Sequence, residues 1–331
     1  MKALVCAEYG LPDTLALTEM ERPVPRDNEV LVEVHASSVT THNLLLVRGR
    51  PFFVRLMGAG LLKPKITIPG SDMAGRVAAV GAGVTRFETG DEVFGDSSLA
   101  GFGAFAEYVS VPENALALKP ANLTFEEAAA VPQAALVALQ GLRDKGQIQK
   151  GQRVLIYGAS GGIGTFAVQI AKYSGAEVTG VCSTRNLDMV RLLGADYAVD
   201  YTKEDFTTSG RPYDMIFAIA YRSIFDFKRS LSPQGIYVST GAPSLKRIFQ
   251  DMLLAPLISR NGGKKLVGGW SLIPNKDLAF IRELIEAGKI RPVIDRRYPL
   301  DEVARAFRYF GVGHSRGKVV ITVGVGAVRE L

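Results

Sequence analysis

A glycine-rich turn between an apolar stretch and an amphipathic stretch is the strongest chemical motif in the sequence. The segment VLIYGASGGIGTFAVQIAK runs from Val154 to Lys172. A turn that holds a dinucleotide needs a tight bend, a close approach of the backbone to the pyrophosphate, and close packing of a helix on a strand. Ala159 takes the first glycine position of such a turn, Gly161 the second and Gly164 the third. The segment therefore predicts a phosphate-binding turn.

The context of this turn makes the interpretation more specific than its glycines alone. We expect a strand before the turn and a helix after it, and that order is the one a dinucleotide site requires. The N-terminus of a helix offers free N–H groups and the positive end of the helix dipole to phosphate. We expect Ser160, Gly161, Gly162 and Ile163 to contact the cofactor there. The alternative is a glycine-rich turn without a ligand.

The residues after the second strand of this region indicate which cofactor binds. An Asp or Glu at that point would bind the ribose 2′-hydroxyl of NADH. The segment 181–186 reads VCSTRN and contains no carboxylate. Ser183, Thr184 and Arg185 suit a 2′-phosphate, because a guanidinium makes charge-assisted bonds to phosphate. We therefore predict NADPH, with Arg185 as a plain surface charge being the alternative.

Cysteine and histidine are too scarce for most metal chemistry. The chain has two cysteines and three histidines. Cys6 and Cys182 fall in expected strands of different domains, and His35, His42 and His314 are dispersed. A catalytic zinc needs three protein ligands, and a structural zinc needs four. We expect neither.

Two kinds of element pattern follow each other along the chain. The first 120 residues contain short strand-like runs separated by Gly and Pro, which favours a β-rich barrel or sandwich. Those runs are 2–8, 15–21, 30–36, 76–80, 92–94 and 104–111. An alanine-rich helix is expected at 126–142, and alternating strands and helices then continue to about residue 270, which indicates a parallel, doubly wound sheet. Helices at 276–287 and 300–309 and a strand at 318–323 complete the chain.

Composition excludes several other classes of protein. Of 331 residues, 47% are hydrophobic and 22% are charged, which is typical of a globular protein. The net charge is +6, but the basic residues are dispersed, so we expect no nucleic-acid partner. The chain has no run of 18 apolar residues and no signal-peptide pattern at its start. We expect a cytoplasmic protein without a membrane span.

Several segments together resemble the medium-chain dehydrogenases/reductases. They are IPGSDMAGRVAAVGAGVTRFETGDEVFG at 68–95 and GHSRGKVVI at 313–321. The stretches AAVPQAALVALQGL, GASGGIGTFAVQIAK and LGADYAVDYTKEDF resemble the quinone oxidoreductase branch of that family. The resemblance spans essentially the whole chain. It implies an α/β protein with a GroES-like β-rich catalytic domain (1–123 and 271–331) and a doubly wound Rossmann domain (124–270). It also implies a homodimer that pairs through the edge strand expected at 266–270.

The same resemblance shows which zinc ligands are missing. Zinc members of the family take a Cys from the segment equivalent to 36–43, where this chain has Thr40. They take a His from a Gly-His-Glu motif, where this chain has Gly70, Ser71 and Asp72. Without zinc there is no Lewis acid to stabilise an alkoxide, so alcohol oxidation is disfavoured. The chain is therefore interpreted as a zinc-independent reductase that passes hydride from NADPH to quinones or α,β-unsaturated carbonyls.

Candidate catalytic residues come from the segment that the resemblance places beside the nicotinamide. Thr40, Thr41 or Asn43 could donate a hydrogen bond to a substrate oxygen. His42 could supply a proton, although a lone loop histidine is usually just solvated. Val137 stands where the family usually has a Thr, which favours a packing role for its helix.

Other cofactor contacts are implied by position. Tyr201 matches a tyrosine that the family places near the 2′-phosphate, and as an exposed aromatic it could equally be inert. Ala220 and Gly241 follow two later strands of the wound domain, where ligands of such folds bind. Arg316 or Lys318 could approach the cofactor from the tail.

Some alternatives stay open at this stage. The apolar segments 51–69 and 245–258 could each cover the substrate, or the first could pack on the core and the second lie at a subunit contact. Three other functions are an NADPH-dependent enoyl or alkenal reductase, an alcohol dehydrogenase-like enzyme, and a non-enzymatic NADPH-binding protein. For the main interpretation we expect the partner to be a small hydrophobic acceptor substrate.

Overall fold

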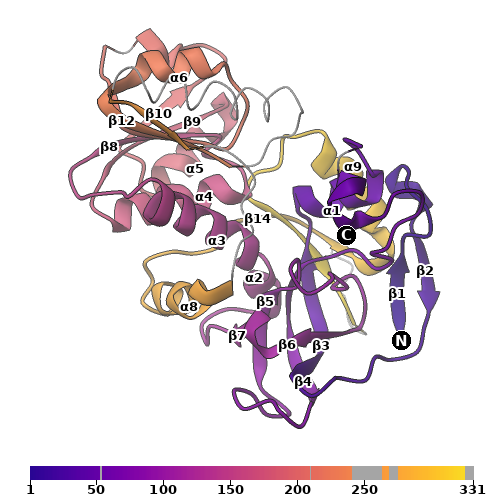
Figure 1. The fold of residues 1–331 in the computed structure, drawn as a ribbon. Coiled ribbons are helices and arrows are strands. Elements are labelled where there is room, and N and C mark those ends of the chain that lie inside the picture. Colours follow the sequence, from indigo (N-terminus) through magenta and orange to yellow (C-terminus); the bar gives the residue numbers. More distant parts are fainter. Residues whose placement is uncertain (53, 209, 241–262, 268–274, 325–331) are drawn as a thin grey trace. The chain divides into compact units, whose positions relative to one another are not determined.

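The chain folds into two compact units. The computed structural model describes residues 1–52, 54–208, 210–240, 263–267 and 275–324. Unit 1 comprises Met1–Leu136, Pro274–Gly288 and Pro292–Leu331, and unit 2 comprises Val137–Ile273 and Lys289–Arg291 (Figure 1). The tail of the chain thus returns to the first unit, so unit 1 is built from separated segments.

Unit 1 is built on a seven-stranded sheet. Its strands follow the order β14–β15–β3–β4–β5–β7, and β6 pairs with β3. Their bounds are Glu29–Ser38 (β3), Asp72–Val80 (β4), Glu92–Asp96 (β5), Tyr108–Pro112 (β6), Leu116–Leu118 (β7), Ile294–Pro299 (β14) and Lys318–Thr322 (β15). All pairs are antiparallel except β14 with β15. A separate hairpin joins β1 (Lys2–Val5) and β2 (Ala16–Glu19).

Helices cover parts of this sheet. They are α1 (Thr41–Arg48), α2 (Phe125–Ala129), α8 (Leu278–Glu286) and α9 (Val303–Gly311). The core includes Val32, Met73 and Phe105, and the Phe105 ring meets Phe307 of α9 edge-on at 5.9 Å between centroids. This packing fixes β3 and β4, whose ends carry the candidate catalytic residues.

Unit 2 is a parallel sheet with helices on both faces. The strand order is β10–β9–β8–β11–β12–β13, and every pair is parallel. The strands are Arg153–Tyr157 (β8), Glu177–Cys182 (β9), Tyr197–Asp200 (β10), Tyr213–Ala218 (β11), Leu231–Ser239 (β12) and Lys265–Val267 (β13). Figure 1 shows α4 (Gly162–Tyr173) and α5 (Leu187–Leu192) on one face of the sheet, with α6 (Ile224–Ser230) on the other. The predicted doubly wound domain is confirmed.

The main differences from the expected elements have local causes. The helix expected at 126–142 is two helices, because Pro132 has no N–H to continue α2 and instead begins α3 (Pro132–Gln140). Strands β7 and β14 and helix α1 were not expected. Helix α2 contacts β3 and β4, and the division between the two compact units falls inside α3, between Leu136 and Val137.

Candidate functional site

The glycine turn of unit 2 has the geometry of a phosphate-binding turn. Gly158 adopts a φ of +93°, which a residue with a side chain rarely adopts. A Cβ on Gly164 would lie 2.1 Å from the Gly158 carbonyl oxygen, so only glycine lets α4 pack this closely. A Cβ on Gly161 would meet only that same oxygen, at 3.7 Å. The Gly161 position thus faces open space, where the backbone of the turn can approach a phosphate.

The N-terminus of α4 begins directly after this turn. Gly161 is its N-cap, and no side chain caps the helix there. The first N–H groups of any helix lack acceptors within that helix. Ser160, Gly162 and Ile163 are half-buried beside them. The donors of the first turn, together with the helix dipole, therefore suit a diphosphate.

A buried asparagine ties the glycine turn to the tip of β9. Asn186 is only 3% exposed. Its Nδ2 donates to the Ser160 Oγ at 3.0 Å and to the Ser183 Oγ at 3.2 Å. Its Oδ1 is buried and has no hydrogen-bond partner. The two serines expected to bind different parts of the cofactor are thus held by one amide.

A carboxylate lies near the expected 2′-phosphate position, on the neighbouring strand. Asp200 ends β10, and its carboxylate accepts hydrogen bonds from the hydroxyl groups of Thr184 and Thr202. These bonds hold the pKa of the Asp200 carboxyl below its usual range. The two threonine hydroxyl groups thus occupy the oxygens of Asp200, which is only 1% exposed. Arg185, which follows β9, is exposed. Tyr201, which follows β10, is 47% exposed.

These residues share one edge of the parallel sheet. The glycine turn follows β8, Ser183–Asn186 follow β9, Tyr201 follows β10 and Ala220 follows β11. The Ala220 N–H bonds the Tyr157 carbonyl, which places Ala220 next to Gly158. The strand order reverses at β8, where ligands of such folds bind outside the carboxyl ends. The predicted Gly241 lies outside the described residues.

In unit 1, the expected catalytic segment caps a helix. Thr40 is the N-cap of α1: its hydroxyl accepts from the Asn43 N–H at 3.2 Å and lies 2.9 Å from Asn43 Oδ1. The Asn43 Nδ2 lies 3.5 Å from the Ser71 Oγ. Thr40 and Asn43 are buried, whereas Thr41 is exposed at the first position of the helix. Of the three expected donors, Thr41 is thus the one that faces outward.

The positions equivalent to zinc ligands do not fit a zinc ion. Thr40 and Ser71 carry hydroxyl groups, and both engage the same asparagine amide. Zinc in proteins takes thiolate, imidazole or carboxylate ligands. Among the residues that the structure describes, no group of three or more His, Cys, Asp or Glu could hold a metal ion.

A buried ion pair lies beside this hydroxyl–amide cluster. Asp72 is fully buried, and Lys318 of β15 is 5% exposed. The Lys318 Nζ donates to Asp72 Oδ2 at 2.8 Å, and the Ser38 hydroxyl donates to the same oxygen at 2.6 Å. The Gln133 N–H donates to Asp72 Oδ1 at 2.9 Å. Lys318 was expected to approach the cofactor, and its ammonium group instead forms an ion pair with Asp72 inside unit 1.

Two more titratable groups lie around this ion pair. Asp96 pairs with Asp72 across β4 and β5 and is 1% exposed. Burial, and then the Asp72 charge, raise the pKa of Asp96 to about 7. Burial lowers the pKa of His42, although Asp72 acts in the opposite direction. Groups with shifted pKa values often lie at functional sites.

Sequence reasoning missed several of these residues. Asp72 was visible only as a departure from Gly-His-Glu, and Asp96, Gln133, Asn186 and Asp200 carried no motif. A buried polar residue cannot be recognised from its type alone, because polar residues are mostly exposed. Of the other expected residues, Arg316 is exposed on the turn before β15, and its N–H donates to Asp295 Oδ2. Val137 is half-buried in α3.

The apolar segment 51–69 is partly tied to the rest of unit 1. The Tyr9 hydroxyl bonds the Ala59 and Gly60 carbonyls at 2.7 and 2.6 Å. The Arg55 guanidinium lies 4.2 Å above the centroid of the Tyr9 ring. Leu62 is 86% exposed, so its apolar surface faces solvent. The second apolar segment, 245–258, lies outside the described residues.

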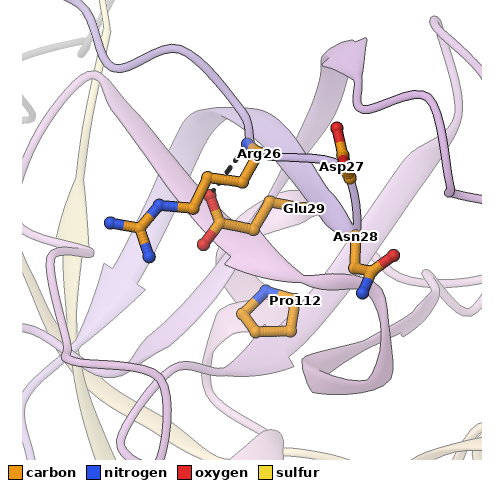
Figure 2. A pocket seen from close by; sticks show the side chains of 5 residues that line it. All are labelled: Arg26, Asp27, Asn28, Glu29 and Pro112. Atoms are coloured by element: carbon orange, nitrogen blue, oxygen red, sulfur yellow. Dashed lines mark hydrogen bonds between the residues drawn. The ribbon is translucent and has the colours of Figure 1, made fainter.

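A surface depression elsewhere on unit 1 is a poor candidate for the site. It measures about 610 Å³ and is lined by Arg26, Asp27, Asn28, Glu29 and Pro112 (Figure 2). Figure 2 shows that its polar groups serve the turn before β3, since the Arg26 N–H bonds the Glu29 carboxylate at 3.1 Å. The depression contains none of the residues that either candidate half-site brings together.

The two units and the candidate residues of each define a class of protein. A GroES-like β-rich unit and a Rossmann-like unit with a nicotinamide-type phosphate turn are the two halves of medium-chain dehydrogenases/reductases. Comparison with known sequences agrees: the family described as alcohol dehydrogenase GroES-like domain matches residues 26–121, and the family described as zinc-binding dehydrogenase matches residues 193–321. The chain belongs to the medium-chain dehydrogenases/reductases, in the quinone oxidoreductase branch.

Relatives along nearly the whole chain specify the branch. The chain is 33% identical to the 2-methylene-furan-3-one reductase of Solanum lycopersicum, over 97% of this chain and 79% of that protein. It is 31% identical to the chloroplastic NADPH-dependent alkenal/one oxidoreductase of Arabidopsis thaliana, over 97% and 79%. The quinone oxidoreductase structure from Coxiella burnetii matches with a TM-score of 0.85 and 28% identity, over 98% and 99%. As a member of this family, the chain is an oxidoreductase with a nicotinamide cofactor.

No helix in the described part of the chain is both long and apolar enough to cross a membrane.

Proposed function

We propose that this protein is a zinc-independent reductase that transfers hydride from NADPH to quinones or α,β-unsaturated carbonyls. One observation carries the proposal: the hydroxyl–amide cluster of Thr40, Asn43 and Ser71 replaces zinc ligands in a chain whose phosphate turn is intact. The relatives named as alkenal/one, furanone and quinone oxidoreductases support the same acceptor class.

The acceptor class follows from what the protein can supply. Bound NADPH supplies a hydride at its nicotinamide ring. An acceptor whose conjugation spreads the developing charge needs no Lewis acid, only correct placement and hydrogen-bond donors at its oxygen. We assign the donors to the Thr40–Asn43 segment: Thr41 is exposed, and Thr40 and Asn43 hold the start of α1 in place.

NADPH rather than NADH is proposed from the tips of β9 and β10. Ser183, Thr184 and the exposed Arg185 offer hydroxyl groups and a cation, and the nearby Asp200 is turned toward its threonines. In an NADH site, a free carboxylate would accept a hydrogen bond from the ribose 2′-hydroxyl. We assign the pyrophosphate to Ser160–Ile163, and Tyr201, Ala220, Gly241 and Arg316 remain proposed contacts of other parts of the cofactor.

Ser183→Asp tests the cofactor assignment. A carboxylate at this position should weaken NADPH binding at least about tenfold, because it meets the 2′-phosphate with like charge, and should spare NADH. Titration of intrinsic fluorescence with each cofactor measures both affinities, and Ser174→Asp, on the C-cap of α4, is the control for an added charge. Unchanged NADPH affinity in Ser183→Asp would show that the 2′-phosphate binds elsewhere.

An acceptor panel together with metal analysis tests the function itself. Purified enzyme should oxidise NADPH with quinones and with enals or enones, and should contain no stoichiometric zinc. The ratio of kcat/KM between quinones and enones separates a quinone reductase from an alkenal reductase. Tight NADPH binding without turnover on any acceptor would instead indicate a cofactor-binding protein, and one zinc per chain with activity on alcohols would overturn the proposal.

We propose further that the enzyme is a cytoplasmic homodimer. Among the described strands, β13 is the last of its sheet, so its outer edge could pair with a second copy. Both cysteines are free thiols, as expected in a reducing compartment. Sedimentation velocity measures the first property, and subcellular fractionation the second.

A further inference from the structure

The hydrogen bonds of Asn186 fix the direction of two serine hydroxyl groups. Asn186 directly precedes α5 and is 3% exposed. Its Nδ2 donates to the Ser160 Oγ at 3.0 Å and to the Ser183 Oγ at 3.2 Å, and its Oδ1 is buried without a partner. Turning the amide over would leave two buried N–H groups unpaired, which costs more than one unpaired oxygen. The amide therefore donates both of its hydrogens to the serines.

Each of the two serines is consequently left as a donor. A hydroxyl group has one hydrogen to donate and two lone pairs that accept. Because Asn186 already donates to each serine oxygen, the hydrogen of each hydroxyl must point elsewhere. Within the described part of the chain, neither the Ser160 nor the Ser183 hydroxyl has an acceptor for that hydrogen. Both serines are only half-buried, and the Gly161 position beside Ser160 faces open space, so a ligand can supply the acceptors.

The next hydroxyl along the chain has the opposite polarity. Thr184 donates its hydrogen to the Asp200 carboxylate, and the Thr202 hydroxyl donates to the same carboxylate at 2.7 Å. These bonds hold the pKa of Asp200 below its usual range, so the carboxylate is ionised at neutral pH and only accepts. Thr184 therefore has no hydrogen left for an anion. Of the two hydroxyl groups that follow β9, the one on Ser183 can donate to a phosphate.

We propose that Asn186 is a positioning residue for NADPH, which directs the Ser160 hydroxyl hydrogen to the pyrophosphate and the Ser183 hydroxyl hydrogen to the 2′-phosphate. The inference rests on the proposed function, which assigns these two serines to the cofactor. Phosphate oxygens accept hydrogen bonds, so hydroxyl groups that are fixed as donors bind them better than hydroxyl groups that turn freely. A ribose 2′-hydroxyl gains less, because it can donate to a serine oxygen as well as accept from it. Asn186 thus favours NADPH over NADH.

The ratio of the affinities for NADPH and NADH isolates the Ser183 branch of this arrangement. Asn186→Ala frees the Ser183 hydroxyl, so we expect the ratio to fall about fivefold, the effect of one hydrogen bond. Ser183→Ala should lower the ratio at least as much. Adding Asn186→Ala to Ser183→Ala should change the ratio no further, because both changes act on the same hydroxyl. Isothermal titration calorimetry with each cofactor measures the affinities without turnover.

ADP isolates the Ser160 branch, because it carries a pyrophosphate and no 2′-phosphate. We expect Asn186→Ala to weaken ADP binding about fivefold. Ser160→Ala should weaken it at least as much, and the double variant should bind ADP no more weakly than Ser160→Ala. Calorimetry with ADP alone measures this branch whichever nicotinamide cofactor the enzyme prefers.

Asn275→Ala is the matched control. The Asn275 Nδ2 also donates two hydrogen bonds, to the Asp96 carbonyl at 2.7 Å and the Ala115 carbonyl at 3.3 Å, and its Oδ1 is likewise buried without a partner. Its acceptors are backbone oxygens of unit 1 rather than serine hydroxyl groups. Asn275→Ala should therefore lower Tm about as much as Asn186→Ala, but keep the wild-type cofactor ratio and the wild-type affinity for ADP.

Several results would overturn the inference. An unchanged cofactor ratio in Asn186→Ala, or losses that multiply in the double variants, would show that Asn186 does not act through the serine hydroxyl groups. An equal fall of the ratio in Asn275→Ala would show that any lost amide has this effect. If the wild type binds NADH as tightly as NADPH, the proposed cofactor and the 2′-phosphate role of Asn186 both fail, whereas the ADP measurements still decide whether Asn186 acts through Ser160.

Discussion

The buried carboxyl of Asp96 should make the stability of the protein depend on pH. Its side chain is 1% exposed and accepts hydrogen bonds from the Ser98 N–H at 2.8 Å and the Ser98 hydroxyl at 3.0 Å. These two bonds favour the charged form, but burial and the Asp72 charge outweigh them and raise the pKa from 3.8 to about 7. Asp96 therefore holds its proton more tightly in the folded chain than in the unfolded chain.

The sign and size of the effect follow from this difference. A raised pKa in the folded state stabilises the fold fully below about pH 4, and this stabilisation is lost as the pH rises through about 7. Between about pH 5 and pH 7 the folded chain binds close to one proton more than the unfolded chain. At ~1.4 kcal/mol per pH unit, the free energy of unfolding should fall by about 2 kcal/mol over this interval and change little from this group above about pH 8.

Asp96→Asn isolates this contribution. Asparagine keeps an oxygen for the Ser98 N–H but cannot ionise, so the variant should lose the fall of about 2 kcal/mol. Urea unfolding, followed by circular dichroism at several pH values, measures the free energy of both proteins. Asp188→Asn is the control, because the Asp188 side chain is 93% exposed. Parallel pH profiles for the wild type and Asp96→Asn would refute the reasoning.

The glycine turn and its asparagine link yield two further predictions. Gly164→Ala places a Cβ 2.1 Å from the Gly158 oxygen and should lower the free energy of unfolding by roughly 1–3 kcal/mol. Gly161→Ala, whose Cβ would lie 3.7 Å from that oxygen, should leave Tm nearly unchanged and still weaken NADPH binding about tenfold or more. Equal losses of Tm in the two variants would contradict this geometry. Asn186→Ala removes the hydrogen bonds to Ser160 and Ser183, which are worth about 1 kcal/mol each. Isothermal titration calorimetry should then show NADPH binding weakened by about 1–2 kcal/mol. Wild-type affinity would mean that Asn186 is not needed to position the two serines.

Much of the fold could be predicted because its signals are local. The alternation of β8, α4 and β9 follows from hydrophobic periods and turn residues within about 30 positions. The structure has this alternation of strand, helix and strand at the glycine turn, as expected. Short strands such as β7, only three residues long, carry too little pattern to be recognised. Helix α1 is only eight residues long, and its N-cap, Thr40, also fits the pattern of a hydrogen-bond donor to a substrate.

The candidate site was less predictable, because its contacts join distant parts of the chain. The phosphate turn is contiguous in sequence and was identified from it. By contrast, the Asp72–Lys318 pair joins residues 246 positions apart, and the Gln133–His42 contact spans 91. A single sequence offers no signal for such pairs, since each residue alone reads as an ordinary polar position. The long-range pairing of β3 with β4 and β15 is what brings them together.

If the enzyme is zinc-independent, as proposed, the charges of unit 1 must be balanced without a metal ion. A catalytic zinc would bring two positive charges to this end of the sheet, but Thr40 and Ser71 offer it no suitable ligands. The fully buried Asp72 still needs a cation, because an unpaired buried carboxylate costs several kcal/mol. Lys318 supplies one positive charge, at 2.8 Å. Among the residues that the structure describes, no such cation pairs with the neighbouring Asp96, and burial and the Asp72 charge raise its pKa to about 7. Burial and the neighbouring Asp72 charge thus account for the raised pKa of Asp96.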